Sequence, residues 1–173
     1  FGLAESDPGF AAMRKEFLDI YANHLCRQSH LFEGMAEVLD FIEQQNLRWG
    51  IVTNKPDFLT RPLLQELLLE ERCACIVSGD TLPQRKPDPA PMLYAAEVAG
   101  CMPVECVYVG DAERDIEAGN RAGMHTLIAR YGYIEKSENP EQWQADGWID
   151  HPAELIDWIN EKIQPLQGQR KRS

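Results

Sequence analysis

The stretch Val107–Asp115 (VYVGDAERD) constrains the fold of this chain more than any other. An apolar run of strand length, Val107–Val109, stops at a Gly-Asp turn, and the residues after the turn re-enter a helical pattern. Asp111 and Asp115 therefore stand at the carboxyl end of a predicted strand, the edge at which open parallel α/β sheets bind ligands. Two carboxylates in this position suit a divalent cation such as Mg²⁺, whereas the structural alternative is that Asp111 caps the next helix.

The rest of the chain alternates apolar runs of strand length with helical patterns. Strands are predicted at Leu47–Thr53, Cys73–Val77, Cys106–Val109, His125–Ala129 and Trp148–Ile149. The predicted helices, of which the first precedes these strands, end near Asn46, Leu69, Ala99, Gly123 and Ile163. Strands that alternate with helices at this spacing are typical of parallel sheets, so we predict an α/β fold with a doubly wound parallel sheet.

Residues 7–25 also follow a helical pattern that precedes the first predicted strand. Its apolar side chains fall on one face: Phe10, Met13, Phe17 and Tyr21. A chain of 173 residues is long enough for one domain with a core and a partial appendage. We therefore expect an appendage over residues 1–30, the α/β domain over 31–163, and a disordered Gln-rich and basic tail over 164–173.

Composition limits the classes of partner. The net charge of −11 repels nucleic acid and acidic membrane surfaces, although a small phosphate ester would still bind where local cations or a metal ion are present. No apolar run reaches the length of a membrane span and no signal peptide is visible, so we expect a cytoplasmic protein. The five cysteines lack the spacing of a zinc site and are expected to be buried thiols. A monomer and a homodimer both stay open.

Three polar clusters follow strands or lie on a loop that faces strand ends. They are Thr53-Asn54-Lys55, Lys86-Pro87, and the pair Asp111 and Asp115. A hydroxyl group and exposed backbone N–H groups can hold phosphate oxygens, and a fixed ammonium can neutralise charge on a phosphate and on a carboxylate nucleophile. Each cluster also has a structural explanation: Thr53 caps a turn, Lys86 is a solvated loop lysine, and Asp111 is an N-cap. The occurrence of all three in this order favours a phosphate site.

With these motifs in place, the chain resembles the haloacid dehalogenase superfamily of aspartyl-phosphate phosphatases, in its phosphoglycolate phosphatase-like branch. The resemblance covers nearly all of residues 32–163. Trp49–Lys55 matches the family's second motif, Lys86–Pro89 the third, and Val109–Asp115 the fourth and most specific. Residues before about Leu31 are similar to the last helix of the family's small α-helical cap.

The resemblance implies a role for each candidate residue. Thr53 and the backbone of Asn54 would hold phosphate oxygens, and Lys86 would fix the nucleophile and offset charge. Asp111 would bind Mg²⁺, while Asp115 would bind it through water or orient Lys86. The implied activity is Mg²⁺-dependent hydrolysis of a small phosphorylated metabolite through an aspartyl-phosphate intermediate.

The family's first motif, a strand ending in Asp-x-Asp-Gly-Thr, is not found in this sequence. Asp19-Ile20-Tyr21 lies within a helical pattern, and Asp80-Thr81 has no second aspartate. In the family this strand is central and supplies the nucleophile and the general acid/base, so we expect an empty position between the strands that end at Thr53 and Val109. We also expect on the order of 50 further residues upstream, and no activity from residues 1–173 alone.

Several alternatives stay open. A haloacid dehalogenase shares the fold and the aspartate nucleophile but needs no Mg²⁺ site, and a non-catalytic phosphate-binding homologue would lack the nucleophile altogether. A receiver-type signalling domain would carry its acidic pair early in a chain of about 120 residues, which does not fit. The stretch Arg130–Ile134 is similar to a bacterial subgroup that includes N-acetylmuramic acid 6-phosphate phosphatases. Tyr131 and Tyr133 there either line the mouth of the site or, as we favour, pack within the loop.

Overall fold

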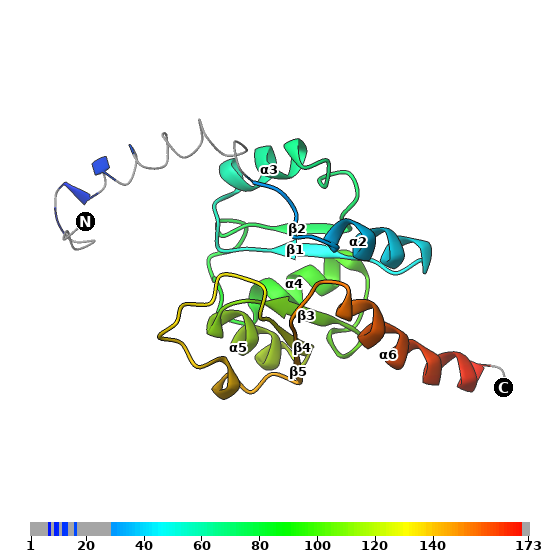
Figure 1. The fold of residues 1–173 in the computed structure, drawn as a ribbon. Helices are drawn as coiled ribbons and strands as arrows, with labels where there is room; N and C mark the ends of the chain where they lie inside the picture. Colours follow the sequence, from blue (N-terminus) through cyan, green and yellow to red (C-terminus); the bar gives the residue numbers. More distant parts are fainter. Residues whose placement is uncertain (1–6, 8, 11, 14–15, 17–28, 171–173) are drawn as a thin grey trace.

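The computed structural model describes residues 7, 9–10, 12–13, 16 and 29–170, with side chains placed as far as residue 162. Its helices are α2 (Met35–Gln44), α3 (Asp57–Glu66), α4 (Ala90–Ala99), α5 (Glu113–Ala122) and α6 (Glu154–Arg170). Its strands are β1 (Gly50–Val52), β2 (Cys75–Val77), β3 (Val107–Gly110), β4 (His125–Ala129) and β5 (Gly147–Ile149). Two short 3-10 helices, η1 (Pro103–Glu105) and η2 (Pro140–Gln142), complete these elements, which alternate along the chain as predicted (Figure 1).

The strands form two parallel sheets. In the first, β1 pairs with β2, and Ile51 lies opposite Ile76. In the second, β4 lies between β3 and β5, and Tyr108 lies opposite Thr126. The predicted parallel α/β fold is confirmed, but a single continuous sheet is not observed, because β1 and β3 form no ladder with each other. The interruption falls where the sequence predicted an empty strand position.

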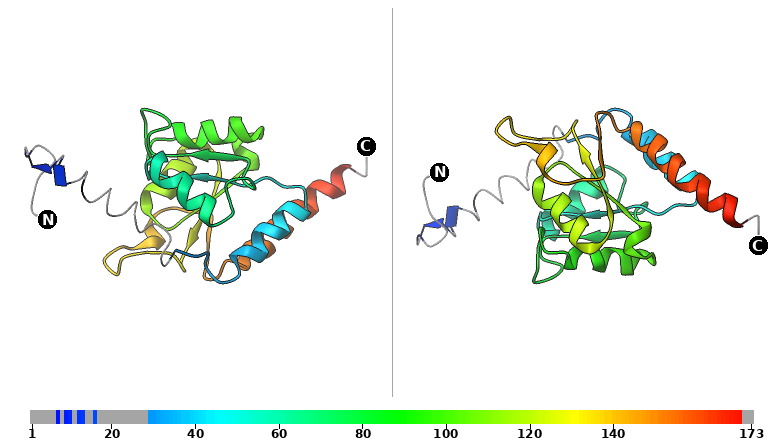
Figure 2. Two further views of the ribbon diagram at one scale, coloured as in Figure 1. Left: turned by 90° about the horizontal axis from the view of Figure 1, so that it is seen from above. Right: turned by 90° about the horizontal axis from the view of Figure 1, so that it is seen from below.

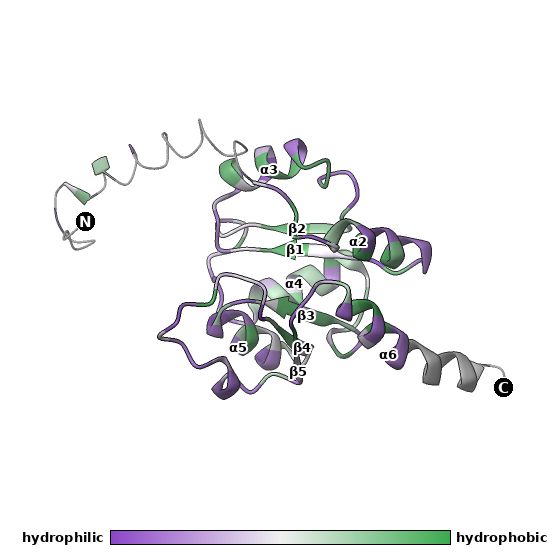
Figure 3. Cartoon of the chain, viewed as in Figure 1, coloured by the Kyte–Doolittle hydropathy of each residue, from purple (hydrophilic) through white to green (hydrophobic). Residues whose placement is uncertain are grey.

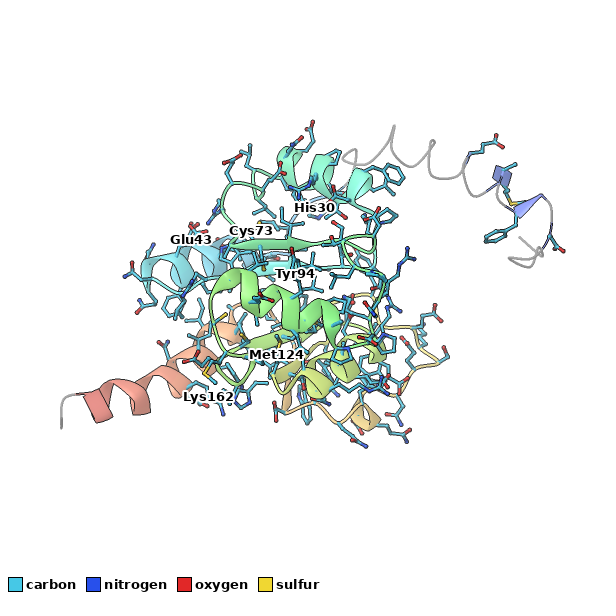
Figure 4. The ribbon with its side chains drawn as sticks, turned by 180° about the vertical axis from the view of Figure 1, so that it is seen from behind. His30, Glu43, Cys73, Tyr94, Met124 and Lys162 are labelled. Atoms are coloured by element: carbon cyan, nitrogen blue, oxygen red, sulfur yellow. The ribbon has the colours of Figure 1, made fainter. Side chains whose placement is uncertain are left out.

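Helices cover both sides of the strands, as in a doubly wound fold (Figure 2). On one side α4 packs on β1 and β2 and also on α5, which lies over β3 and β4. α4 therefore bridges the two sheets, and it lies in front of them when the molecule is seen from behind (Figure 4). On the other side Val38 and Ile42 of α2 pack with Leu127 and with α6. The apolar residues of the strands lie between these helical layers (Figure 3).

Local sequence explains where the central helices begin and end. α4 has Pro91 in its first turn, where a missing N–H costs no helical hydrogen bond. It ends at Gly100, whose φ of 66° lies in the left-handed region that glycine adopts without strain. α5 ends in the same way at Gly123, with a φ of 75°. Each strand that follows can then start close to the helix before it.

Some predicted boundaries are wrong. β1 begins at Gly50 and not at Leu47, which is exposed, and the guanidinium of Arg48 donates to the backbone carbonyls of Ala99 and Gly100. The segment before β1 therefore serves as a connection to the end of α4. The backbone of α6 is helical as far as Arg170, beyond the predicted end at Ile163. The predicted disorder of residues 164–173 stays a prediction.

The predicted helix over residues 7–25 falls largely outside the described residues. Phe10 and Met13 are described, and their N–H groups donate to Asp7 and Gly9 carbonyls, as in a helical turn. Phe17 and Tyr21 lie outside the described residues, and so does Cys26. The other four cysteines are free thiols, of which Cys75 is buried and the rest are half-buried. None of the helices in the described part of the chain has the length and apolar character needed to cross a membrane.

The core makes a direct stability prediction. Leu127 of β4 is 1% exposed and packs within the α2 and α6 cluster, so Leu127→Ala should lower the free energy of unfolding by about 2–5 kcal/mol. Leu68→Ala, at a residue that is 80% exposed, should change it by less than about 0.5 kcal/mol. Urea unfolding of both variants tests this packing, and similar losses at the two positions would contradict it.

Candidate active site

Lys86 lies at the centre of the candidate site although it is almost fully buried. Its side chain is 7% exposed, and Nζ lies 2.8 Å from Oδ1 of Asp115. Nζ also donates to the backbone carbonyl of Val52 at 2.9 Å and to the hydroxyl of Tyr108 at 2.8 Å. A buried ammonium is tolerated only when it is paired and hydrogen-bonded, and Lys86 meets both conditions. The alternative that Lys86 is a solvated loop lysine is therefore wrong.

Asn54 holds the backbone of Lys86 in place. Its Nδ2 donates to the Lys86 carbonyl at 3.0 Å, and its Oδ1 accepts from the Lys86 N–H at 3.1 Å. The residue directly after β1 and the loop before α4 are thus joined by two hydrogen bonds. Both polar atoms of the Asn54 side chain are engaged in this way, and its backbone N–H is the group that could meet a phosphate.

Thr53 directly follows β1 and extends its pairing, because its N–H donates to the Val77 carbonyl at 2.8 Å. Its Oγ1 accepts the N–H of Lys55 at 3.1 Å, so the structural role of closing a turn is present. A hydroxyl that accepts one hydrogen bond still has its own proton to donate to an anion. The turn and a phosphate contact are therefore compatible.

Asp115 is held beside Lys86 by the first turn of α5. The residue is 6% exposed, and Oδ1 accepts no well-aligned hydrogen bond, so its contact with Lys86 Nζ is an ion pair. Gly110, at the end of β3, lies so close that an added Cβ would clash with the Cβ of Asp115. Any side chain at position 110 would push Asp115 away from Lys86, which explains the glycine before Asp111.

Asp111 does not cap α5, so that structural alternative is wrong. The N-cap position is Ala112, and no side chain bonds to the helix N-terminus. The Oδ2 of Asp111 instead accepts the backbone N–H of Tyr133 at 2.9 Å, from the loop after β4. An added Cβ on Gly132 would lie 2.6 Å from the same oxygen, so this loop packs directly against the carboxylate.

The sequence does not identify Tyr108 as part of the site, because its pattern predicts only a strand residue there. Its hydroxyl donates to the Val52 carbonyl at 2.9 Å and accepts from Lys86, so it links β3 to β1. Burial, followed by the negative charges of Asp115 and Asp111, raises the pKa of Tyr108 well above its usual value, against a smaller opposing effect of Arg114. The sequence pattern places Tyr108 in a strand but cannot show that its hydroxyl meets Val52 and Lys86.

The two aspartates provide the type of oxygen ligands that Mg²⁺ prefers. No described residue bonds to Oδ1 of Asp111, so this oxygen is free to bind a cation. Asp115 is engaged with Lys86, which favours an orienting role over direct coordination. Within the described residues no group of three or more acidic, His or Cys side chains could hold a metal. The site therefore fits Mg²⁺ only together with ligands from elsewhere, such as a substrate phosphate and water.

The structure thus joins all three predicted clusters around Lys86. Asn54 bonds to its backbone, Asp115 pairs with its ammonium, and Asp111 precedes the helix that carries Asp115. Comparison with known proteins bears on what this arrangement is. The model of the haloacid dehalogenase-like hydrolase family matches residues 3–129, which include every candidate residue. The chain belongs to this family.

Relatives in the family carry two kinds of name. The N-acetylmuramic acid 6-phosphate phosphatase of Pseudomonas putida is 45% identical over 155 residues, which are 90% of this chain and 70% of the relative. The phosphoglycolate phosphatase of Xanthomonas campestris is 44% identical over 83% of this chain and 65% of its own length. The solved structure of a predicted phosphoglycolate phosphatase from Haemophilus somnus superposes with a TM-score of 0.82 at 29% identity, covering 91% of this chain and 68% of that protein.

The two hydrogen bonds from the Asn54 side chain to the Lys86 backbone, here called the Asn54 clamp, make a testable prediction. Asn54→Ala should lower the free energy of unfolding by about 1–3 kcal/mol, because the N–H and carbonyl of Lys86 lose their partners. Asn139→Ala, at an exposed asparagine without a side-chain cap bond, is the matched control and should have little effect. Equal unfolding midpoints for Asn54→Ala and the unmodified protein would show that the clamp contributes nothing.

The buried hydroxyl of Tyr108 predicts a specific pH dependence. Its raised pKa means that the folded protein keeps the proton while the unfolded chain releases it above about pH 10, so stability falls as the pH rises through that value. Tyr108→Phe lacks this group, so the stability advantage of the unmodified protein over the variant should shrink between about pH 8 and about pH 11. A constant difference across that range would contradict the assignment.

Proposed function

We propose that this protein is a Mg²⁺-dependent phosphate monoester hydrolase that acts on a small phosphorylated metabolite. The observation that carries the proposal is the buried Lys86–Asp115 ion pair, placed at the carboxyl ends of β1 and β3 beside Thr53 and Asp111. Membership of the haloacid dehalogenase-like family and the names of the relatives support the same class. Phosphoglycolate and N-acetylmuramic acid 6-phosphate are the two substrates that these names suggest.

The proposed reaction proceeds through an aspartyl-phosphate. A carboxylate oxygen attacks phosphorus as the bond to the ester oxygen breaks, and the alcohol leaves with a proton from a second aspartate. That aspartate then takes a proton from water, which attacks phosphorus and releases inorganic phosphate. Residues 1–173 contain no Asp-x-Asp sequence, so we propose that both aspartates come from chain outside these residues.

The split of the sheet supports this proposal. β1 and β3 each have one edge paired with a neighbour, and their other edges have no strand ladder among the described residues. A strand between them would end beside Lys86, whose Nζ already reaches from the Val52 carbonyl of β1 to the Tyr108 hydroxyl of β3. The 70% coverage of the Pseudomonas putida relative leaves room for such a strand in the whole protein.

Each described side chain then has a proposed role. The ammonium of Lys86 would hold the nucleophilic carboxylate and offset the negative charge of the phosphoryl group, with Asp115 orienting it. The Thr53 hydroxyl and the Asn54 N–H would donate to phosphate oxygens. Asp111 would bind Mg²⁺ through Oδ1, and the bound ion would neutralise charge on the phosphate.

The wider organisation is also a proposal. Residues 1–30 would be the remnant of a small helical cap, 31–163 the hydrolase core, and 164–173 a disordered tail. We expect the protein to act in the cytoplasm on small molecules, without nucleic acid or membrane partners, as a monomer or a homodimer.

The role of Asp111 can be tested in the intact protein. Asp111→Asn should lower the Mg²⁺-dependent turnover of p-nitrophenyl phosphate by about a thousandfold, because a bound metal contributes several kcal/mol to transition-state stabilisation. Glu113→Gln, at an exposed acid in the first turn of α5, should retain activity.

Three results would count against this function. If Asp111→Asn retained most of the activity, Asp111 would not be the metal ligand that we propose. Metal-independent release of halide from a 2-haloacid, without phosphatase activity, would instead identify a dehalogenase. An intact protein that binds inorganic phosphate but hydrolyses no ester would be a non-catalytic homologue.

A further inference from the structure

Three aromatic side chains pack together, two of them from the loop whose backbone bonds to Asp111, and they have no role in the reaction proposed above. Phe32 lies just before α2, while Tyr131 and Tyr133 lie in the loop after β4, the yellow segment of Figure 1. The ring centroids of Phe32 and Tyr131 are 5.0 Å apart in an edge-to-face arrangement, and those of Phe32 and Tyr133 are 5.8 Å apart. We call these three residues the aromatic wall.

The wall is fixed at its base and open at its outer end. Tyr131 packs against the core cluster that includes Val38 and Leu127. Phe32 is 39% exposed and rests on Tyr131, while Tyr133 is 86% exposed. An aromatic ring held in place by its backbone and a neighbouring ring, yet left open to solvent, is a common ligand contact, because it loses little conformational freedom on binding.

The wall is continuous with the proposed metal site. The backbone N–H of Tyr133 donates to Oδ2 of Asp111, the oxygen opposite the one available for a cation. Burial, followed by the negative charge of Asp111, raises the pKa of Tyr131. A phosphate ester bound at Asp111 would therefore lie beside the loop that carries Tyr131 and Tyr133.

Phe32 lies within the part of the chain that the family model matches, whereas the two tyrosines of the wall lie outside it. The family model matches residues 3–129 and ends before Tyr131 and Tyr133. The residues for phosphoryl transfer thus lie inside the shared region, whereas the two tyrosines lie beyond it.

We propose that the aromatic wall, with Tyr133 as its exposed surface, selects phosphate esters whose alcohol is a sugar ring. The C–H groups on one face of a pyranose pack against an aromatic ring, as other apolar surfaces do. Phosphoglycolate has no such face, so it would gain no packing energy from the wall. This inference rests on the proposed function and assigns the substrate class for the same site.

The test compares two substrates in the intact protein with Mg²⁺. Tyr133→Ala should lower kcat/KM for N-acetylmuramic acid 6-phosphate by about tenfold, mainly through a higher KM. The reason is that the lost stacking contact would stabilise the bound substrate and the transition state equally. The value for phosphoglycolate should change by less than about twofold. Tyr133→Phe keeps the ring and should restore the sugar phosphate activity.

A second variant controls for the loss of an exposed tyrosine elsewhere. Tyr94→Ala removes a partly exposed tyrosine from α4, on the side of the sheet seen in Figure 4, and should leave both kcat/KM values unchanged. The backbone N–H of residue 133, which donates to Asp111, is retained in Tyr133→Ala, so the variant should still hydrolyse phosphate esters.

The outcomes separate this inference from the function that underlies it. An unchanged ratio of the two kcat/KM values in Tyr133→Ala overturns the aromatic wall as a substrate contact and leaves the phosphatase proposal intact. An equal loss on both substrates overturns it as well, because the residue would then act on the site in general. An intact protein that hydrolyses neither ester overturns the proposed function, and this inference with it.

Discussion

The buried ammonium of Lys86 is the interaction on which the rest of this structure depends. Removal of a charged amine from water is costly, and here the cost is offset by a carboxylate, a carbonyl and a hydroxyl that converge on Nζ. These partners come from β1, β3 and α5. Since β1 and β3 share no strand ladder, Lys86 and Tyr108 supply the polar links between them, while α4 packs across both sheets on one side.

The same interaction explains why several unremarkable residues occupy their positions. Asn54 fixes the backbone of Lys86, so the direction of the Lys86 side chain is set before any ligand binds. Gly110 allows Asp115 to approach the end of β3, and Gly132 allows the loop after β4 to reach Asp111. A site assembled in this way is preorganised, because the protein holds its charged groups in place before any ligand binds.

Much of this architecture could be predicted from sequence, since alternating apolar runs and helical patterns identify βαβ units. Asp111, Asp115 and Lys86 were found because strand ends and a Gly-Asp turn are local signals. The contacts of Asn54 and Tyr108 were not found, because both depend on partners 32 and 56 residues away, respectively. The length of β1 was overestimated for the same reason, since only the residues opposite β2 can pair.

The sequence motifs indicate the class of enzyme, whereas the structure shows how the individual side chains of the site are held. The motifs pointed to a phosphatase with a missing strand, and the two separate sheets agree with that expectation. The sequence left Asp111 as either a cation ligand or a helix cap, and only the contact with Tyr133 shows which oxygen stays open to a cation. The sequence pointed to Tyr131 and Tyr133 but not to Phe32, because Phe32 is distant from them in sequence.

A crystal structure of the intact protein with Mg²⁺ and orthovanadate, a mimic of the transferring phosphoryl group, tests the central claim most directly. The account predicts vanadium bonded to an aspartate on a strand between β1 and β3, with Lys86 Nζ, Thr53 Oγ1 and Oδ1 of Asp111 around the vanadate and the ion. Vanadate bound elsewhere, or β1 and β3 joined in one continuous ladder with Lys86 facing away from the anion, would contradict it.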